Sequence, residues 1–124
     1  MTRRRERVDQ LLKGEIAELL RQAKDPRLAA FVSITDVETS PDLRHTRVFV
    51  SIMGEEEEKQ EVMAGLKAAA GFLRHELRQR LDLRYIPELS FRRDDSIERG
   101  AMLLQLIHDV TADEPAAPDE KGES

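Results

Sequence analysis

Four residues of one helical stretch have the types and the spacing needed to bind phosphate groups. They are Lys67, Gly71, Arg74 and Arg78, and they lie on one stripe of an α-helix. Three of them are cationic, and the glycine between them has no Cβ, which would let a phosphate backbone approach the main chain closely. The stripe therefore points to nucleic acid, although on this pattern alone a solvated charged face remains the alternative.

Further arginines surround this stripe in the sequence. Arg80 is spaced for an ion pair with Glu76 one helical turn earlier, whereas Arg84 follows the helix and is free to reach outward. Tyr85 either closes the edge of the core or stacks on a base. The complete set of predicted RNA-binding residues is Arg3, Arg4, Arg5, Arg7, Lys67, Arg74, Arg78, Arg80 and Arg84.

Catalytic and metal chemistry find weaker support in the sequence. Asp94, Asp95 and Glu98 resemble a magnesium site, but a helix cap made by Asp95 and Glu98 explains two of the three. The three histidines fall on different elements without ligand spacing, and the chain has no cysteine. We therefore predict no catalytic residue, no metal and no cofactor.

Charge is distributed unevenly along the 124 residues, whose formal net charge is −5. Residues 109–124 are strongly acidic, so residues 1–108 are balanced overall, and five of their acids gather between residues 55 and 61. The remaining surface must be locally basic, and screening makes local charge decisive within about 8–10 Å. No apolar run is long enough for a membrane span, which together with the composition predicts a cytoplasmic protein without membrane contact.

Hydrophobic periodicity predicts an α+β domain with helices packed on a three-stranded sheet. Pro26 ends the first helix, because the residue before a proline resists the helical conformation. Ser40-Pro41-Asp42 is a turn signal between two β-rich runs, which we expect to form an antiparallel hairpin. An unbroken helix of roughly 40 Å would overhang so small a core, so we expect a kink at Ala69, Ala70 and Gly71. The expected elements are helix 3–24, strands 31–39 and 46–53, a kinked helix 55–82, strand 87–91 and helix 96–110, in a domain of residues 1–110 followed by an acidic disordered tail, 111–124.

Six short motifs occur in a characteristic order along the chain. They are Asp25-Pro26-Arg27-Leu28, Ser40-Pro41-Asp42-Leu43, Val48-Phe49-Val50-Ser51, Ala69-Ala70-Gly71-Phe72-Leu73-Arg74, Pro87-Glu88-Leu89-Ser90-Phe91 and Asp94-Asp95-Ser96-Ile97-Glu98-Arg99-Gly100. Together they resemble the bacterial ribosome-binding factor A family over residues 3–108. Helix-strand-strand-helix-kink-helix-strand, with a short C-terminal helix, is likewise similar to the type II KH fold.

The resemblance implies a non-enzymatic, monomeric assembly factor. It would bind the free 30S subunit and 16S rRNA late in maturation, support 16S rRNA 5′-end processing and growth in the cold, and be released with a ribosome-associated GTPase. The family replaces the KH Gly-x-x-Gly loop by an Ala-x-Gly kink, matched here by Ala69, Ala70 and Gly71. The short acidic tail departs from the family pattern. The alternative is a KH-like RNA-binding adaptor for a non-ribosomal RNA.

Overall fold

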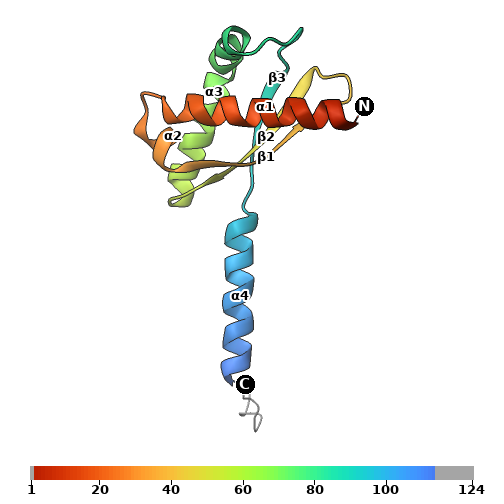
Figure 1. Cartoon of the computed structure of the whole chain (residues 1–124). Helices are drawn as coiled ribbons and strands as arrows, with labels where there is room; N and C mark the ends of the chain where they lie inside the picture. The colour runs from red at the N-terminus through yellow and green to blue at the C-terminus, as the bar shows by residue number, and fades with distance from the viewer. Residues whose placement is uncertain (1, 114–124) are drawn as a thin grey trace. The chain divides into compact units, whose positions relative to one another are not determined.

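The computed structural model describes residues 2–113 and confirms an α+β fold with a three-stranded sheet (Figure 1). Its contacts divide the chain into two compact units that meet between Asp94 and Asp95, and each unit is described by itself. No helix in the described range is both long and apolar enough to cross a membrane. In chain order the elements are α1 (Thr2–Arg21), α2 (Pro26–Ala30), β1 (Val32–Thr39), β2 (His45–Ile52), α3 (Glu56–Arg80), β3 (Glu88–Arg93) and α4 (Ser96–Asp113).

The sheet has the order β1-β2-β3, so β2 lies in the centre. The predicted hairpin is confirmed, because β1 pairs with β2 in antiparallel register from Val32 opposite Ile52 to Thr39 opposite Thr46. A register shift leaves Thr35 as an extra residue in β1. β3 returns beside β2 in parallel, and α3 provides the crossover that a parallel pair needs.

The core of the first unit lies between the helices and one face of this sheet. α1 and α3 pack on β1 and β3 and on each other. Leucine and isoleucine side chains of the two helices meet the inward-facing valines of β2, and the hydrophobic residues with no exposed surface are Leu12, Ile16, Val48, Val50, Leu66 and Leu77. Alternation along β2 therefore buries one face of the strand and leaves the other, which carries Arg47, toward solvent.

The chain between the first helix and the sheet differs from the prediction. α1 ends at Arg21, three residues earlier than expected, and the short helix α2 follows. Asp25 caps α2, because its carboxylate accepts a hydrogen bond of 3.0 Å from the Arg27 N–H. Pro26 therefore begins a new helix, because proline suits the first position of a helix as well as the position after its end.

The predicted kink at Ala69, Ala70 and Gly71 does not interrupt α3. The helix runs without a break from Glu56 to Arg80, straight through Ala69, Ala70 and Gly71. Good helix formers surround the glycine, and Leu66, Leu73 and Leu77 stay buried at helical spacing on both sides of it, which outweighs a cost of about 1 kcal/mol for one glycine. In Figure 1 the last, darker turns of α3 are seen more nearly end-on than its first turns, so α3 changes direction without leaving the helix.

The start of α3 is fixed by a tight turn and an ion pair. Gly54 has φ of +126°, and a Cβ there would lie 2.8 Å from Glu58 Oε1, so only glycine fits. That same Oε1 accepts a hydrogen bond of 2.9 Å from the Glu55 N–H. Arg93, at the end of β3, donates two hydrogen bonds of 2.6 and 2.9 Å to the Glu56 carboxylate. This pair joins the first turn of α3 to the last strand.

We expect the Glu56–Arg93 pair to make the protein less stable in acid. The hydrogen bonds from Arg93, above all, lower the pKa of Glu56 from 4.5 to about 2. Because the folded pKa is lower than the unfolded one, the stabilisation is complete above pH 4.5 and disappears as the pH falls toward 2. Thermal unfolding of Glu56→Gln between pH 2 and 7 should give a lower Tm than wild type at neutral pH only. Glu57→Gln, one exposed position away, should follow the wild-type curve.

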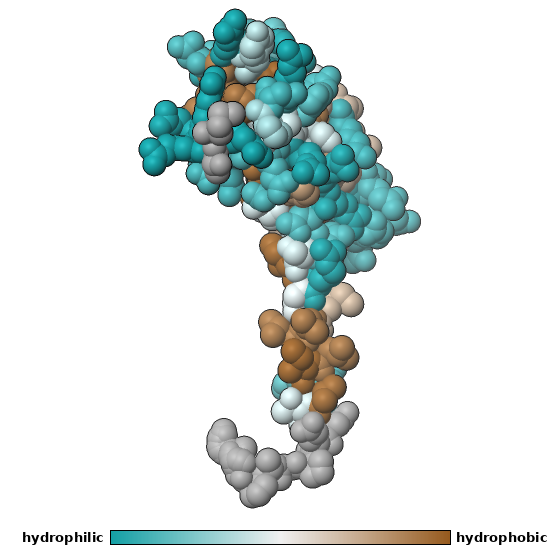
Figure 2. Space-filling view, turned by 90° about the vertical axis from the view of Figure 1, so that its right-hand side faces the viewer, coloured by the Kyte–Doolittle hydropathy of each residue, from teal (hydrophilic) through white to brown (hydrophobic). Residues whose placement is uncertain are grey.

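The second unit, as far as it is described, is the single helix α4. It extends to Asp113, beyond the predicted end at residue 110, and residues 114–124 of the predicted tail lie outside the described residues. Large apolar side chains are exposed along α4 from Ile97 to Val110, and Figure 2 colours the middle of the helix mainly brown. Exposed apolar side chains in such number are typical of a helix that packs against another apolar surface. The predicted domain boundary at residue 110 stays a prediction.

Candidate nucleic-acid interface

The first turns of α1 carry an unusual concentration of positive charge. Arg3, Arg4, Arg5 and Arg7 all lie inside the helix rather than in a flexible entrance before it, and three of them are exposed. The first turn contains no acidic residue. Cations are unfavourable at a helix N-terminus, where the macrodipole and the unpaired N–H groups are already positive. Both effects add to one strongly positive surface that would attract an anion.

Two contacts hold this end of α1 on the sheet. Arg5 Nε donates a hydrogen bond of 3.2 Å to the Thr39 carbonyl oxygen at the end of β1. The Thr39 hydroxyl donates in turn to the Asp9 carboxylate and lies 3.0 Å from the buried hydroxyl of Thr46. Of the four arginines, Arg5 therefore has a structural partner, and the network positions Arg3, Arg4 and Arg7 on a rigid support.

The predicted stripe of α3 is formed on one continuous helix. Lys67, Gly71 and Arg78 are exposed, and a Cβ added to Gly71 would meet nothing within 4 Å. The space in front of the glycine is therefore open, as a close approach by a phosphate backbone requires. Arg74 is only half-exposed, because its Nε donates a hydrogen bond of 2.9 Å to the Ile86 carbonyl oxygen. Arg74 thus fixes the segment between α3 and β3 as well as contributing charge.

Arg80 does not pair with Glu76 as its spacing indicated. Its Nη2 donates a hydrogen bond of 2.9 Å to Gln22 Oε1, and its Nη1 lies 3.6 Å from Glu15 Oε1. Arg80 therefore ties the end of α3 to α1, which makes it the weakest of the predicted RNA-binding residues. Arg80 contacts residues in and directly after α1 instead of Glu76, and spacing within the α3 sequence cannot predict such contacts.

Tyr85 adds an exposed aromatic side chain to this cationic surface. Its side chain is 63% exposed, so it does not close the core edge. The Arg84 guanidinium carbon lies 5.5 Å from the centre of its ring. One surface pocket holds Tyr85 with Arg84 and Arg4, and a second holds it with Arg44 and Arg74. Tyr85 thus joins the start of α1 to the α3 stripe.

Asp94, one of the three residues that resemble magnesium ligands, is hydrogen-bonded to the sheet instead. Asp94 Oδ2 accepts a hydrogen bond of 2.6 Å from the Thr35 hydroxyl, the extra residue of β1. Among residues 2–113, histidine and acidic side chains form no group of three suited to a metal ion. Asp94 is accordingly part of the sheet edge.

These features define the class of protein. An antiparallel hairpin, a long helix and a strand returning in parallel beside β2 form a type II KH-like α+β domain, with cationic side chains along α1 and α3.

Comparison with known proteins names the family within this class. The family model of ribosome-binding factor A matches residues 4–107. The ribosome-binding factor A of Microcystis aeruginosa is 49% identical over 123 residues, which cover 98% of this chain and 96% of that protein. This chain belongs to the ribosome-binding factor A family.

Solved structures agree with this assignment. The crystal structure of ribosome-binding factor A from Thermus thermophilus has a TM-score of 0.63 and 28% identity, over 72% of this chain and 93% of that one. A homology model of the Thermus thermophilus factor, fitted into the electron cryomicroscopy map of a complex with the 30S subunit, has a TM-score of 0.58 and 27% identity over 70% and 91% of the two chains.

Proposed function

We propose that this protein binds the free, immature 30S ribosomal subunit late in its assembly, through 16S rRNA, and supports 5′-end processing of that RNA without catalysing it. It acts as a monomer in the cytoplasm, and a ribosome-associated GTPase takes part in its release. The mechanism is steric and electrostatic: cationic helices occupy a site on the rRNA, and release lets maturation proceed. A role in growth in the cold belongs to the same proposal.

The observation that carries the proposal is the arginine-rich start of α1. Three exposed arginines are placed where the helix dipole opposes them, so they lower the stability of the helix. Side chains that conflict with the preferences of their own helix, without a compensating contact, are expected at functional sites. Membership of the ribosome-binding factor A family and the 30S complex of the Thermus thermophilus relative support the small subunit as the ligand.

Sedimentation with free 30S subunits over a range of salt concentrations tests this proposal. The double variant Lys67→Ala and Arg78→Ala leaves the structural contact of Arg74 intact. It should bind more weakly, and the slope of log affinity against log salt should fall by about one for each lost phosphate contact. The matched control is Arg21→Ala with Arg47→Ala, which removes two positive charges that are paired with Glu18 and Glu38. The control should keep the wild-type slope.

Each other outcome of this experiment has a distinct meaning. Equal slopes for the two double variants would contradict the placement of the α3 stripe on the rRNA. No co-sedimentation with 30S subunits, together with salt-sensitive binding to total cellular RNA, would favour an adaptor for a non-ribosomal RNA. Absence of salt-sensitive binding to either would contradict an RNA-binding function altogether.

A further inference from the structure

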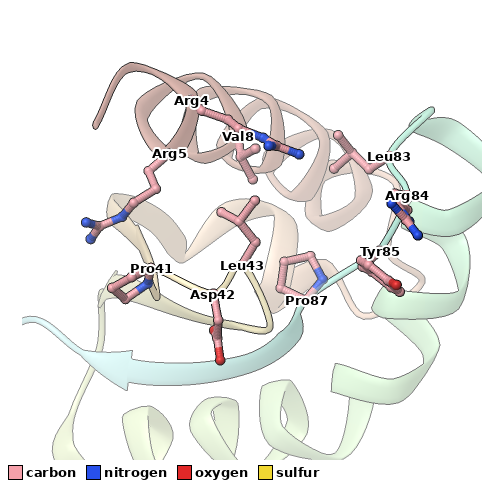
Figure 3. A pocket seen from close by; sticks show the side chains of 10 residues that line it. All are labelled: Arg4, Arg5, Val8, Pro41, Asp42, Leu43, Leu83, Arg84, Tyr85 and Pro87. Atoms are coloured by element: carbon pink, nitrogen blue, oxygen red, sulfur yellow. The ribbon is translucent and has the colours of Figure 1, made fainter. Parts of the chain in front are cut away.

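A pocket of about 340 Å³ opens between the start of α1, the turn from β1 to β2 and the segment from α3 to β3 (Figure 3). Its floor is apolar and is made by Val8, Leu43 and Pro87. Its rim carries Arg4, Arg84 and Tyr85. Ligand sites of this size are lined mainly by apolar groups with a few convergent polar ones, as this pocket is.

The floor of the pocket is held by a strained residue. Leu43 has φ of +62°, a conformation that bulky side chains rarely adopt. A hydrogen bond of 2.9 Å from its N–H to the Ser40 carbonyl oxygen closes the turn. In Figure 3 the Leu43 side chain points toward Val8, so the unfavourable backbone conformation brings an apolar surface under α1. Strain of this kind is concentrated at binding and catalytic sites.

The anionic and cationic side chains around the pocket point in different directions (Figure 3). The Asp42 side chain points away from Leu43 in Figure 3, and it accepts hydrogen bonds from the Ser40 hydroxyl at 2.6 Å and the Arg44 N–H at 3.1 Å. The Ser40 hydrogen bond, first of all, lowers the pKa of Asp42, so this carboxylate stays ionised within the turn. Arg5 is likewise engaged by Thr39. Arg4 and Arg84 therefore remain as the two cationic groups beside the apolar floor.

We propose that this pocket binds one unpaired nucleotide of the RNA. The base lies on the apolar floor and stacks on Tyr85, while Arg4 and Arg84 contact the flanking phosphates. Arg84 already lies over the Tyr85 ring, which orders the aromatic side chain before the base arrives. Proteins recognise single-stranded RNA largely by such stacking, which is sequence-tolerant because every base has a flat face. The inference deepens the proposed function and rests on it for the identity of the RNA.

Tyr85 provides its own optical probe, because it is the only tyrosine and the chain has no tryptophan. Short unstructured oligoribonucleotides should quench its fluorescence, whereas a stable abasic analogue with the same number of phosphates should not. The oligoribonucleotide should bind about tenfold more tightly than the abasic analogue, as one stacked base would give. Tyr85→Ala should remove this difference, and Tyr85→Phe should keep it when binding is followed by calorimetry.

Two further variants separate the base from the phosphates. Arg4→Ala should weaken binding of both oligomers equally, since a phosphate contact does not depend on the base. Phe72 is a second aromatic residue with 62% of its surface exposed, but it lies outside the pocket, so Phe72→Ala should have no effect. Thermal unfolding of each variant checks that it folds.

Unchanged tyrosine fluorescence, or equal affinity for the two oligomers, would overturn the inference. So would a loss of the base-dependent affinity in Phe72→Ala as large as in Tyr85→Ala. Sedimentation of wild-type protein with 30S subunits tells this failure from that of the proposed function. If co-sedimentation persists, only the nucleotide pocket is wrong, and if it is absent, the proposed function fails as well.

Discussion

Arg3→Glu is expected to weaken binding to 30S subunits by about tenfold at low salt and, at the same time, to raise the stability of the protein. The reversal removes an exposed cation from the start of α1 and places an anion at the positive end of the helix dipole. It also replaces repulsion from Arg7, one turn further on, by a favourable pair. The free energy of unfolding should rise by about 0.5–1.5 kcal/mol. Urea denaturation and 30S sedimentation measure the two effects.

The same helix offers the control for this prediction. Arg21, the last residue of α1, is exposed and pairs with Glu18. Arg21→Glu changes the net charge by the same amount, but it puts an anion at the negative end of the helix, so it should destabilise the protein. Its 30S affinity should stay close to wild type. If both reversals weakened binding equally, affinity would follow net charge, and the arginine-rich end of α1 would not be the contact surface.

Gly71→Ala is the second prediction in which stability and binding should move in opposite directions. Alanine is favoured over glycine in a helix interior by about 1 kcal/mol, and the new Cβ meets no neighbouring atom. The melting temperature should therefore increase by about 4 °C. If an rRNA backbone lies against Gly71, the added methyl group removes that close approach, and the loss of about 1 kcal/mol of binding is about a fivefold weaker affinity.

Gly65 supplies the matched comparison. It lies in the same helix, is equally exposed and has equally open space at its Cβ position, but it faces away from the Lys67–Arg78 stripe. Gly65→Ala should increase stability to the same extent and leave 30S affinity unchanged. Identical affinities for the two alanine variants would mean that Gly71 is not at the RNA surface.

The sequence predicted an element well where its apolar residues follow a single helical or strand period. The apolar face of α1 and the alternation in β2 are read from single side-chain periods, and the residues concerned are buried as expected. A kink in α3 was predicted from the length of the helix against the size of the core. The buried leucines on both sides of Gly71 keep the helix continuous while it changes direction (Figure 1).

The site was predicted less well, because its parts meet only in three dimensions. The sequence around Arg80 does not indicate its hydrogen bond to Gln22, and the sequence around Arg74 does not indicate its hydrogen bond to the Ile86 carbonyl oxygen. For Tyr85 the sequence left two alternatives, closing the core edge or stacking on a base, and only its exposure in the structure excludes the first. The conformation of Leu43 was not foreseen at all, since the turn signal around Pro41 fixes a reversal but not which residue takes the positive φ.

The parallel pairing of β3 with β2 sets the order in which the domain can form. The hairpin of β1 and β2 needs only neighbouring chain, whereas β3 must wait until the whole of α3 has been made and has crossed the sheet. The segment with Arg84 and Tyr85 connects α3 to β3. Its backbone is held by Arg74, which donates a hydrogen bond of 2.9 Å to the Ile86 carbonyl oxygen, and by the Glu88 N–H, which donates one of 2.8 Å to the Arg44 carbonyl oxygen. In a nascent chain that does not yet include β3, Tyr85 therefore has no fixed position, even if the arginines of α1 and α3 are already in place.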